Sequence, residues 1–200
     1  MTEAVKTDVP SDAALMAGVA RGDGAMLGEL YRRYGHTVRM AIWRWFPQNA
    51  SADADDLVQD IFLALGASAK TYREQERFKA WLFTIAFRKA TDMTRAASRR
   101  GKDMERRRLD EANSPGWNAA VSHETRSEMR VAVRQMLDLL PHESREVLLL
   151  HVVDGFTAAE IGRITGVDET TARTRLHRAR KRVLEHTESS KWKLLLEGGA

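Results

Sequence analysis

Apolar residues recur at steps of three and four positions along most of this chain, which is the spacing of amphipathic helices. Sustained period-two alternation, the pattern of a half-buried strand, is absent. The first segments predict helices on either side of a break at Gly22–Gly24, then a helix from about Gly35 to Phe46 that stops before Pro47. The pattern therefore predicts an all-α fold.

Two further helices follow in the first half of the chain. One is capped by Ser51 or Asp53 and ends near Gly66. The longest runs from about Arg77 to Arg100. Its mostly apolar face is expected to carry Phe78, Trp81, Leu82, Ile85, Lys89, Asp92, Met93 and Ala96.

The regular spacing breaks after residue 100 and returns near Met129. We therefore expect two small helical domains joined by a flexible linker. The expected parts are a disordered N-terminus (1–11), a first domain (12–100), the linker (101–125), a second domain (126–186) and a C-terminal extension (187–200), which is favoured as a packing helix over a partner contact.

Composition narrows the functional classes. The chain has no cysteine, which excludes disulfides, thiolate zinc sites and thiol catalysis. The first ten residues are not an apolar run, and no later stretch approaches the roughly 20 apolar residues that span a bilayer. We expect a cytoplasmic protein without membrane insertion.

The net charge of +4 is distributed unevenly. Residues 51–69 hold four acidic and no basic residues, whereas residues 70–102 hold ten basic and three acidic ones. Residues 173–182 hold six basic and no acidic residues. Separate basic segments are typical of a chain that binds a polyanion, because each neutralised phosphate releases counterions. The alternative for each run is a solvated helix face.

A helix-turn-helix is the strongest local signal. Thr157 and Glu160 have the spacing of a capping box, Gly166 suits a tight turn, and Asp168 can cap the next helix. That helix is expected to bury Ala172, Leu176 and Ala179. Its polar and basic outer face suits the major groove of DNA, although a helical hairpin with a charged face is the alternative.

The long helix carries two aromatic residues opposite its expected apolar face. Phe83 and Phe87 alternate there with Arg88 and Arg95. Aromatic rings among arginines can stack on unpaired bases while the cations follow phosphates, which predicts single-stranded DNA as a ligand. The alternative is that either ring packs against the first helices.

Four motifs in order now resemble those of a bacterial extracytoplasmic-function (ECF) sigma factor of the sigma-70 family. They are Asp53-Ala-Asp-Asp-Leu-Val-Gln-Asp-Ile-Phe-Leu, Phe78-Lys-Ala-Trp-Leu-Phe-Thr-Ile-Ala, Leu140-Pro-His-Glu-Ser-Arg-Glu-Val-Leu-Leu-Leu and Thr171-Ala-Arg-Thr-Arg-Leu-His-Arg-Ala-Arg. The resemblance covers about residues 12–182. It implies sigma region 2 in the first domain and sigma region 4 in the second.

The resemblance also implies roles for individual residues. The acidic helix would bind the clamp helices of core RNA polymerase through Asp53, Asp56, Leu57, Gln59 and Asp60. Recognition and melting of the minus-ten element would fall to Lys70, Arg73, Arg77, Phe83, Thr84, Phe87, Arg88, Thr91 and Arg95. The duplex minus-thirty-five element would be bound by Glu169, Thr170, Thr171, Arg173, Thr174, Arg175, His177 and Arg178. Further implied partners are the polymerase flap and an anti-sigma factor.

Two positions depart from the family pattern. Phe87-Arg88 stands where Arg-Asn is common, which puts the base preference there in doubt. Gly162 stands where alanine is common, at an expected cost of about 0.5–1 kcal/mol in helix propensity.

Other functions have less support. A helix-turn-helix activator that does not replace sigma would leave the acidic helix and the Trp81 segment unexplained. The sequence holds no Ser/His/Asp constellation, phosphate loop or metal-ligand spacing. We therefore expect no enzyme activity, cofactor or metal site.

Overall fold

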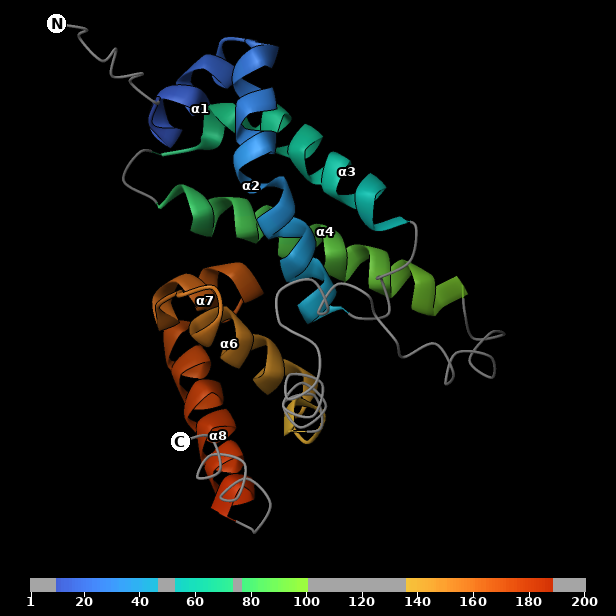
Figure 1. The fold of residues 1–200 in the computed structure, drawn as a ribbon, viewed down its shortest axis with the longest axis vertical. Coiled ribbons are helices and arrows are strands. Elements are labelled where there is room, and N and C mark those ends of the chain that lie inside the picture. The colour runs from blue at the N-terminus through green and yellow to red at the C-terminus, as the bar shows by residue number, and fades with distance from the viewer. Residues whose placement is uncertain (1–9, 47–52, 74–76, 101–135, 189–200) are drawn as a thin grey trace, which may run out of the picture.

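The computed structural model describes residues 10–46, 53–73, 77–100 and 136–188, and within them the chain is helical and has no strand. Figure 1 shows two helical units in contact with each other. The all-α prediction is confirmed. The elements are α1 (Asp12–Ala20), α2 (Gly24–Trp45), α3 (Asp53–Ser68), the 3-10 turn η2 (Ala69–Thr71), α4 (Phe78–Arg100), α6 (His142–Val152), α7 (Ala158–Thr165) and α8 (Glu169–Glu188).

The first helices begin at side-chain caps. The Ser11 hydroxyl accepts a hydrogen bond from Ala14 N, and the Asp23 carboxylate accepts bonds from two amides at the start of α2. Gly22 turns the chain between α1 and α2 with a φ of +89°. The expected disordered N-terminus spans residues 1–11, of which residues 1–9 lie outside the described residues and Ser11 caps α1.

The helix break expected near Gly35 is wrong. Helix α2 is continuous from Gly24 to Trp45, and Gly35 lies buried within it against the ring of Tyr31. A glycine inside a helix costs only about 1 kcal/mol, so it does not by itself end one. The predicted stop before Pro47 is in agreement with the end of α2.

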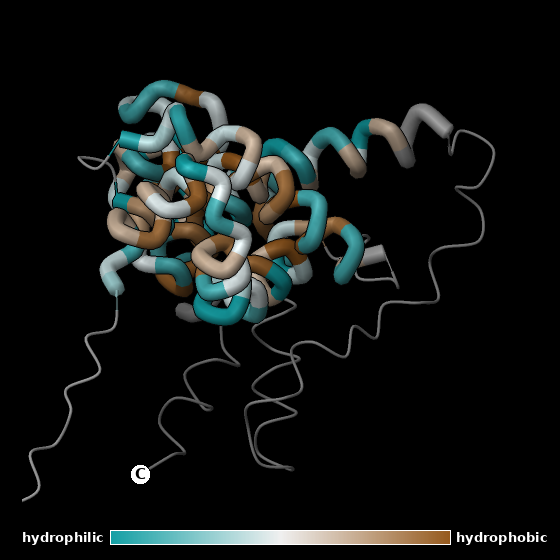
Figure 2. Tube along the Cα trace, turned by 90° about the horizontal axis from the view of Figure 1, so that it is seen from above, coloured by the Kyte–Doolittle hydropathy of each residue, from teal (hydrophilic) through white to brown (hydrophobic). Residues whose placement is uncertain are grey.

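The core of the first unit lies between α1, α2, α3 and α4. Figure 2 shows apolar residues concentrated toward the interior of the molecule. Its fully buried large side chains include Leu15, Leu30, Ile42, Trp45, Ile61, Leu65, Leu82 and Phe83. Burying each such side chain stabilises the fold by about 1.5–3 kcal/mol.

Helix α4 buries only part of the predicted face, with Phe78 and Leu82 in the core, and it also buries residues predicted to lie opposite that face. Phe83 is 0% exposed and Phe87 is 7% exposed, whereas Trp81 and Ile85 are only partly buried. The cause is that α4 is covered from two directions, by α2 in its own unit and by α7 from the second unit. A helix covered in this way has no single apolar stripe.

The second unit consists of α6, α7 and α8. Leu150, Phe156, Ile161, Ala172 and Ala179 are each at most 1% exposed in its interior. The expected linker (101–125), the residues up to 135, the cap at Ser51 and the extension from 189 onward lie outside the described residues. Within the described ranges, no helix has both the length and the apolar character that crossing a membrane requires.

Candidate nucleic-acid interface

The predicted helix-turn-helix is formed by α7 and α8. The Thr157 hydroxyl accepts a bond from Glu160 N, and the Glu160 carboxylate accepts one from Thr157 N at 2.8 Å, which completes the capping box. Gly166 ends α7 in the left-handed region with a φ of +77°. Asp168 accepts a bond from Thr171 N at 2.8 Å, so it caps α8.

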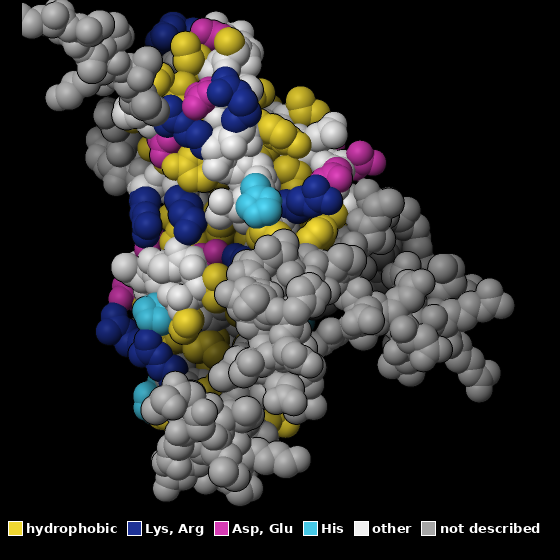
Figure 3. All heavy atoms as spheres, in the orientation of Figure 1, with side chains coloured by type: hydrophobic (Ala, Val, Ile, Leu, Met, Phe, Trp, Pro, Cys, Tyr) yellow, Lys and Arg dark blue, Asp and Glu magenta, His cyan; other side chains and the backbone are white. Residues whose placement is uncertain are grey.

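Helix α8 buries one face and exposes the other as predicted. Ala172, Leu176 and Ala179 are buried. The exposed residues are Glu169, Thr170, Arg173, Thr174, His177 and Arg178. Figure 3 shows Lys and Arg side chains gathered along this edge of the second unit. The arrangement presents hydrogen-bonding and cationic groups on a helix of a width that fits a DNA major groove.

Two residues predicted for the same site are less available. The Thr171 hydroxyl donates to Asp168 at 2.6 Å. Arg175 is partly buried and forms an ion pair with Glu143 of α6 at 2.6 Å. Both side chains contribute to holding α8 in place.

A groove of about 760 Å³ lies between the start of α6 and α8. Its lining is mostly polar and basic: Pro141, Glu143, Ser144, Thr170, Thr171, Thr174, Arg175, Arg178, Lys181, Arg182 and Glu185. Four cations against two carboxylates make the groove attractive to phosphate.

The residues predicted for the minus-ten element divide into exposed and buried groups. The exposed ones are Lys70, Arg73, Arg77, Arg88 and Arg95. Thr84 is partly buried and donates to Ala80 O at 2.9 Å, and Thr91 is partly buried. The expectation that Phe83 and Phe87 lie off the core is wrong, because both rings pack against Trp45, at centroid distances of 5.3 and 5.5 Å.

Sequence reasoning missed a second aromatic pair. Tyr72 and Trp81 are both partly buried, and their rings lie 5.2 Å apart beside the loop between η2 and α4, which carries Arg73 and Arg77. Trp81 has helical spacing with the expected core, so only the basic residues around Tyr72 could have pointed to this pair. Partly exposed aromatic rings beside arginines suit stacking on bases.

The acidic helix α3 presents one polar face. Asp55, Asp56, Gln59 and Asp60 are exposed, and Asp55 pairs with Arg39 at 2.7 Å. Figure 3 shows acidic side chains at the right-hand edge of the first unit, near the start of α3. Leu57, predicted for the same surface, is 5% exposed and belongs to the core, where it anchors α3. The side chain of Asp53 lies outside the described residues.

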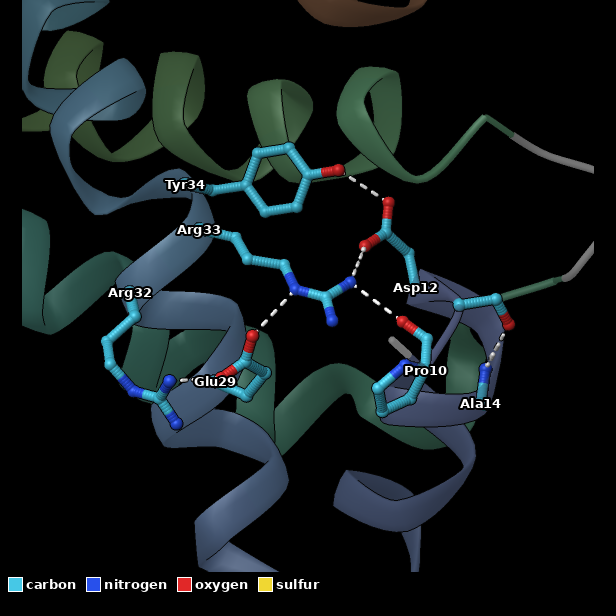
Figure 4. Close-up of polar contacts among 8 residues, drawn as sticks. Pro10, Asp12, Ala14, Glu29, Arg32, Arg33 and Tyr34 are labelled. Atoms are coloured by element: carbon cyan, nitrogen blue, oxygen red, sulfur yellow. Dashed lines mark hydrogen bonds and ion pairs between the residues drawn. The ribbon is translucent and has the colours of Figure 1, made fainter. Parts of the chain in front are cut away.

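A polar network ties α1 to α2 (Figure 4). Arg33 donates to Glu29, to Asp12 and to the Pro10 carbonyl, and the Tyr34 hydroxyl donates to Asp12 at 2.5 Å. Burial and this bond to Asp12 raise the pKa of Tyr34 to about 12. The bond from Arg33 lowers the pKa of Glu29. The Tyr34 ring also packs 5.1 Å from Phe78, so the network positions the start of α4.

In the described part of the chain, no group of three or more His, Asp or Glu side chains could hold a metal ion. The exposed surfaces described above are an acidic helix face on α3, arginines and aromatic rings near the start of α4, and the polar and basic face of α8.

Comparison with known proteins gives the same picture. The family model for Sigma-70 region 2 matches residues 30–100, and that for Sigma-70, region 4 matches residues 130–183. The RNA polymerase sigma factor NccH of Alcaligenes xylosoxydans xylosoxydans is 31% identical over 189 residues, which are 92% of this chain and 98% of NccH. The ECF RNA polymerase sigma-E factor of Escherichia coli K12 is 28% identical over 179 residues, 86% of this chain and 92% of that protein.

Two solved structures share the fold. A chain in the complex of CnrH with the cytosolic domain of CnrY is 23% identical with a TM-score of 0.62, and the match covers 90% of this chain and 99% of that one. A chain in the complex of the sigma factor RpoE with the anti-sigma factor NepR from Bartonella quintana is 22% identical with a TM-score of 0.60, covering 82% and 98%. From the family models and the relatives together, this chain belongs to the ECF group of the sigma-70 family, whose members are non-enzymatic transcription initiation factors.

Proposed function

We propose that this protein binds core RNA polymerase, directs it to promoters with specific minus-ten and minus-thirty-five elements, and promotes DNA melting in the cytoplasm. The observation that carries the proposal is the exposed face of α8, held on a capped helix-turn-helix. Family membership makes RNA polymerase and promoter DNA the expected partners.

The minus-thirty-five element is assigned to the exposed residues of α8. Arg173 and Arg178 can donate two hydrogen bonds to guanine, and Thr170 and Thr174 can bond other base edges. Arg173 also forms an ion pair with Glu169 at 2.5 Å, and both side chains are exposed. The groove beside α6 adds cations for the phosphate backbone.

The minus-ten element is assigned to the segment from Lys70 to Arg77 and to α4. Lys70, Arg73 and Arg77 provide cations, and the Tyr72 and Trp81 rings provide a stacking surface. Capturing one flipped base offsets part of an unstacking cost of a few kcal/mol, and contacts with polymerase supply the remainder.

Binding of core polymerase is assigned to the exposed face of α3. Asp56, Gln59 and Asp60 lie within about one turn of each other and form a negative surface. Such a surface steers and orients a basic partner. The second unit would contact the polymerase flap.

Control by an anti-sigma factor is also proposed. The solved RpoE structure with the same fold contains the anti-sigma factor NepR. Co-purification from the source cell under non-inducing conditions is expected to recover a bound inhibitor. Recovery of free protein or of the polymerase complex alone would count against this part of the proposal.

Reconstitution tests the proposed function. The protein is added to core RNA polymerase with genomic DNA of the source organism, and transcript 5′ ends are mapped. Initiation at a small set of sites sharing two spaced elements is expected only when the protein is present. An activator that does not replace sigma would leave core polymerase silent.

A further inference from the structure

The two units meet at a cluster of charged and aromatic side chains. The turn Asp154–Gly155–Phe156, between α6 and α7, reaches into the first unit. Arg44 of α2 donates to the Asp154 carboxylate at 2.7 Å, and Lys79 of α4 donates to the Asp154 carbonyl at 2.8 Å. Arg77 donates to the Gly155 carbonyl at 3.4 Å.

Aromatic contacts complete the cluster. The Phe156 ring meets the Phe83 ring edge to face, with centroids 5.0 Å apart. The Lys79 ammonium lies 5.3 Å from the Phe83 ring and 5.1 Å from the Phe156 ring. The second unit therefore supplies part of the cover that buries Phe83, which is 0% exposed.

We define the socket on the first unit as Arg44, Arg77, Lys79 and Phe83. It offers three cations, of which the Lys79 ammonium lies 5.3 Å from the Phe83 ring. Its present occupant offers a carboxylate, two carbonyl oxygens and an aromatic ring. A nucleotide offers the same combination, an anionic phosphate beside a flat ring.

The contact combines this buried aromatic pair with polar groups that are costly to bury. The Asp154 side chain is 3% exposed, and neither its Oδ2 atom nor the buried Arg44 Nε has a hydrogen-bond partner among the described residues. Burial raises the pKa of Asp154 and lowers that of Lys79, and nearby opposite charges oppose both changes. The desolvation cost of a buried ion pair offsets much of its attraction, so the pair is weak evidence for a stable contact. Contacts between domains of one chain commonly open and close unless they are large and apolar.

We propose that the socket is a binding site for one nucleotide of single-stranded DNA, and that the Asp154–Gly155–Phe156 turn fills it in the closed arrangement of the two units. Closing of the units and binding of the melted strand then exclude each other. The proposal rests on the proposed function, since it names further residues of the minus-ten site and an internal competitor for them.

Fluorescence energy transfer between the units tests the closed contact. Because the chain has no cysteine, dyes can be placed at A17C on α1 and A159C on α7, both at exposed positions. Asp154→Arg is expected to lower the transfer, as is Arg44→Asp from the other side. The charge-swapped double variant is expected to restore it. Unchanged transfer in both single variants would overturn the proposal.

Binding of a fluorescent random-sequence 20-nucleotide single strand tests the competition. Asp154→Arg is expected to bind it at least about tenfold more tightly than the unmutated protein, because the competent state is no longer occupied by the turn. Adding the strand to the unmutated protein should lower the energy transfer. Lys79→Ala in the Asp154→Arg background should weaken binding.

A matched control removes the effect of charge alone. Asp138→Arg changes the net charge equally, and the ion pair it breaks, with Arg145, lies within the second unit. It is expected to leave energy transfer unchanged and to raise affinity much less. Equal affinity gains in the two variants, or strand binding with no change in transfer, would overturn the proposal. If the protein did not support initiation by core polymerase, the proposed function would be refuted. The competition between the turn and the single strand could still be measured with the energy-transfer and binding assays.

Discussion

A Cβ atom on Gly162 would lie 2.8 Å from the carbonyl oxygen of Val167, so these residues leave no room for a side chain between α7 and the turn into α8. Helix propensity alone favours alanine over glycine by about 0.5–1 kcal/mol. The close approach reverses this preference, because the obstructing atom belongs to the backbone.

Gly162→Ala is therefore expected to destabilise the protein by about 1–3 kcal/mol through overpacking, less the propensity gain. Gly28→Ala is the matched control, since Gly28 lies inside α2 and a Cβ there would meet no described atom within 4 Å beyond its own helix backbone. The unfolding free energy of the Gly28→Ala variant should rise by about 0.5–1 kcal/mol. Urea denaturation measures the change in unfolding free energy for both variants. If the two changes had the same sign, the explanation by close backbone approach would be contradicted.

The burial of Phe87 leads to a second prediction. Its ring packs against Trp45 and Phe46 at 5.5 and 5.6 Å. Phe87→Ala should cost about 3–5 kcal/mol of unfolding free energy. Lys89→Ala, at an exposed neighbouring position, should change stability by less than about 0.5 kcal/mol. If Phe87→Ala instead kept its stability and lost affinity for single-stranded DNA, the ring would be a base-stacking residue.

The sequence predicted those features that depend on neighbours in the chain. The capping box of Thr157 and Glu160 and the turn at Gly166 each require only a few adjacent residues, and the structure confirms both. The buried face of α4 was predicted only in part, because Phe83 is covered by Trp45 of α2 and by Phe156 of the other unit. Periodicity describes one helix and contains no information about a distant segment that packs on it.

The same limit applies to the candidate sites. The exposed face of α8 followed from its spacing, since a short three-helix unit buries only one side of that helix. Leu57 was assigned to a surface by resemblance, and its apolar side chain instead lies in the core. Arg44, Lys79 and Asp154 carried no local signal, because their contact joins segments far apart in the sequence.

A pH effect is expected at His142. The Glu146 carboxylate accepts a bond from its ring at 3.1 Å and raises the pKa of His142 above the ordinary 6.5. A raised folded-state pKa means that the stabilisation is fully present below about 6.5 and is lost as the pH rises through the folded value. The pKa can be measured by NMR titration of the ring protons.

Glu146→Gln should return the pKa of His142 toward 6.5, whereas Glu143→Gln should lower it less, since Glu143 is the weakest of the contributing charges. A His142 pKa that is insensitive to Glu146→Gln would contradict the ion pair.

Reversal of the acidic face of α3 tests the polymerase assignment. Asp56→Lys with Asp60→Lys should weaken affinity for core polymerase at least about tenfold, because a negative surface that orients a basic partner becomes repulsive. Both side chains are exposed, so each change should alter stability by less than about 0.5 kcal/mol. Asp138→Lys with Glu185→Lys carries the same charge change at other exposed positions. Equal loss in both double variants would mean that net charge, not this face, governs binding.

Arg178 and Arg175 should behave differently although they lie one turn apart on α8. Arg178 is exposed, whereas Arg175 is partly buried and paired with Glu143. Arg178→Ala should cost about 1–3 kcal/mol of affinity for the promoter duplex if it reads a base. If it contacts phosphate, the loss should extend to a scrambled duplex and reduce the salt slope by about one. Compared with Arg178→Ala, Arg175→Ala should cost less DNA affinity and more unfolding free energy. Fluorescence anisotropy at several salt concentrations measures the affinity, and urea denaturation measures the unfolding free energy. A larger affinity loss for Arg175→Ala than for Arg178→Ala would show that its ion pair opens on DNA.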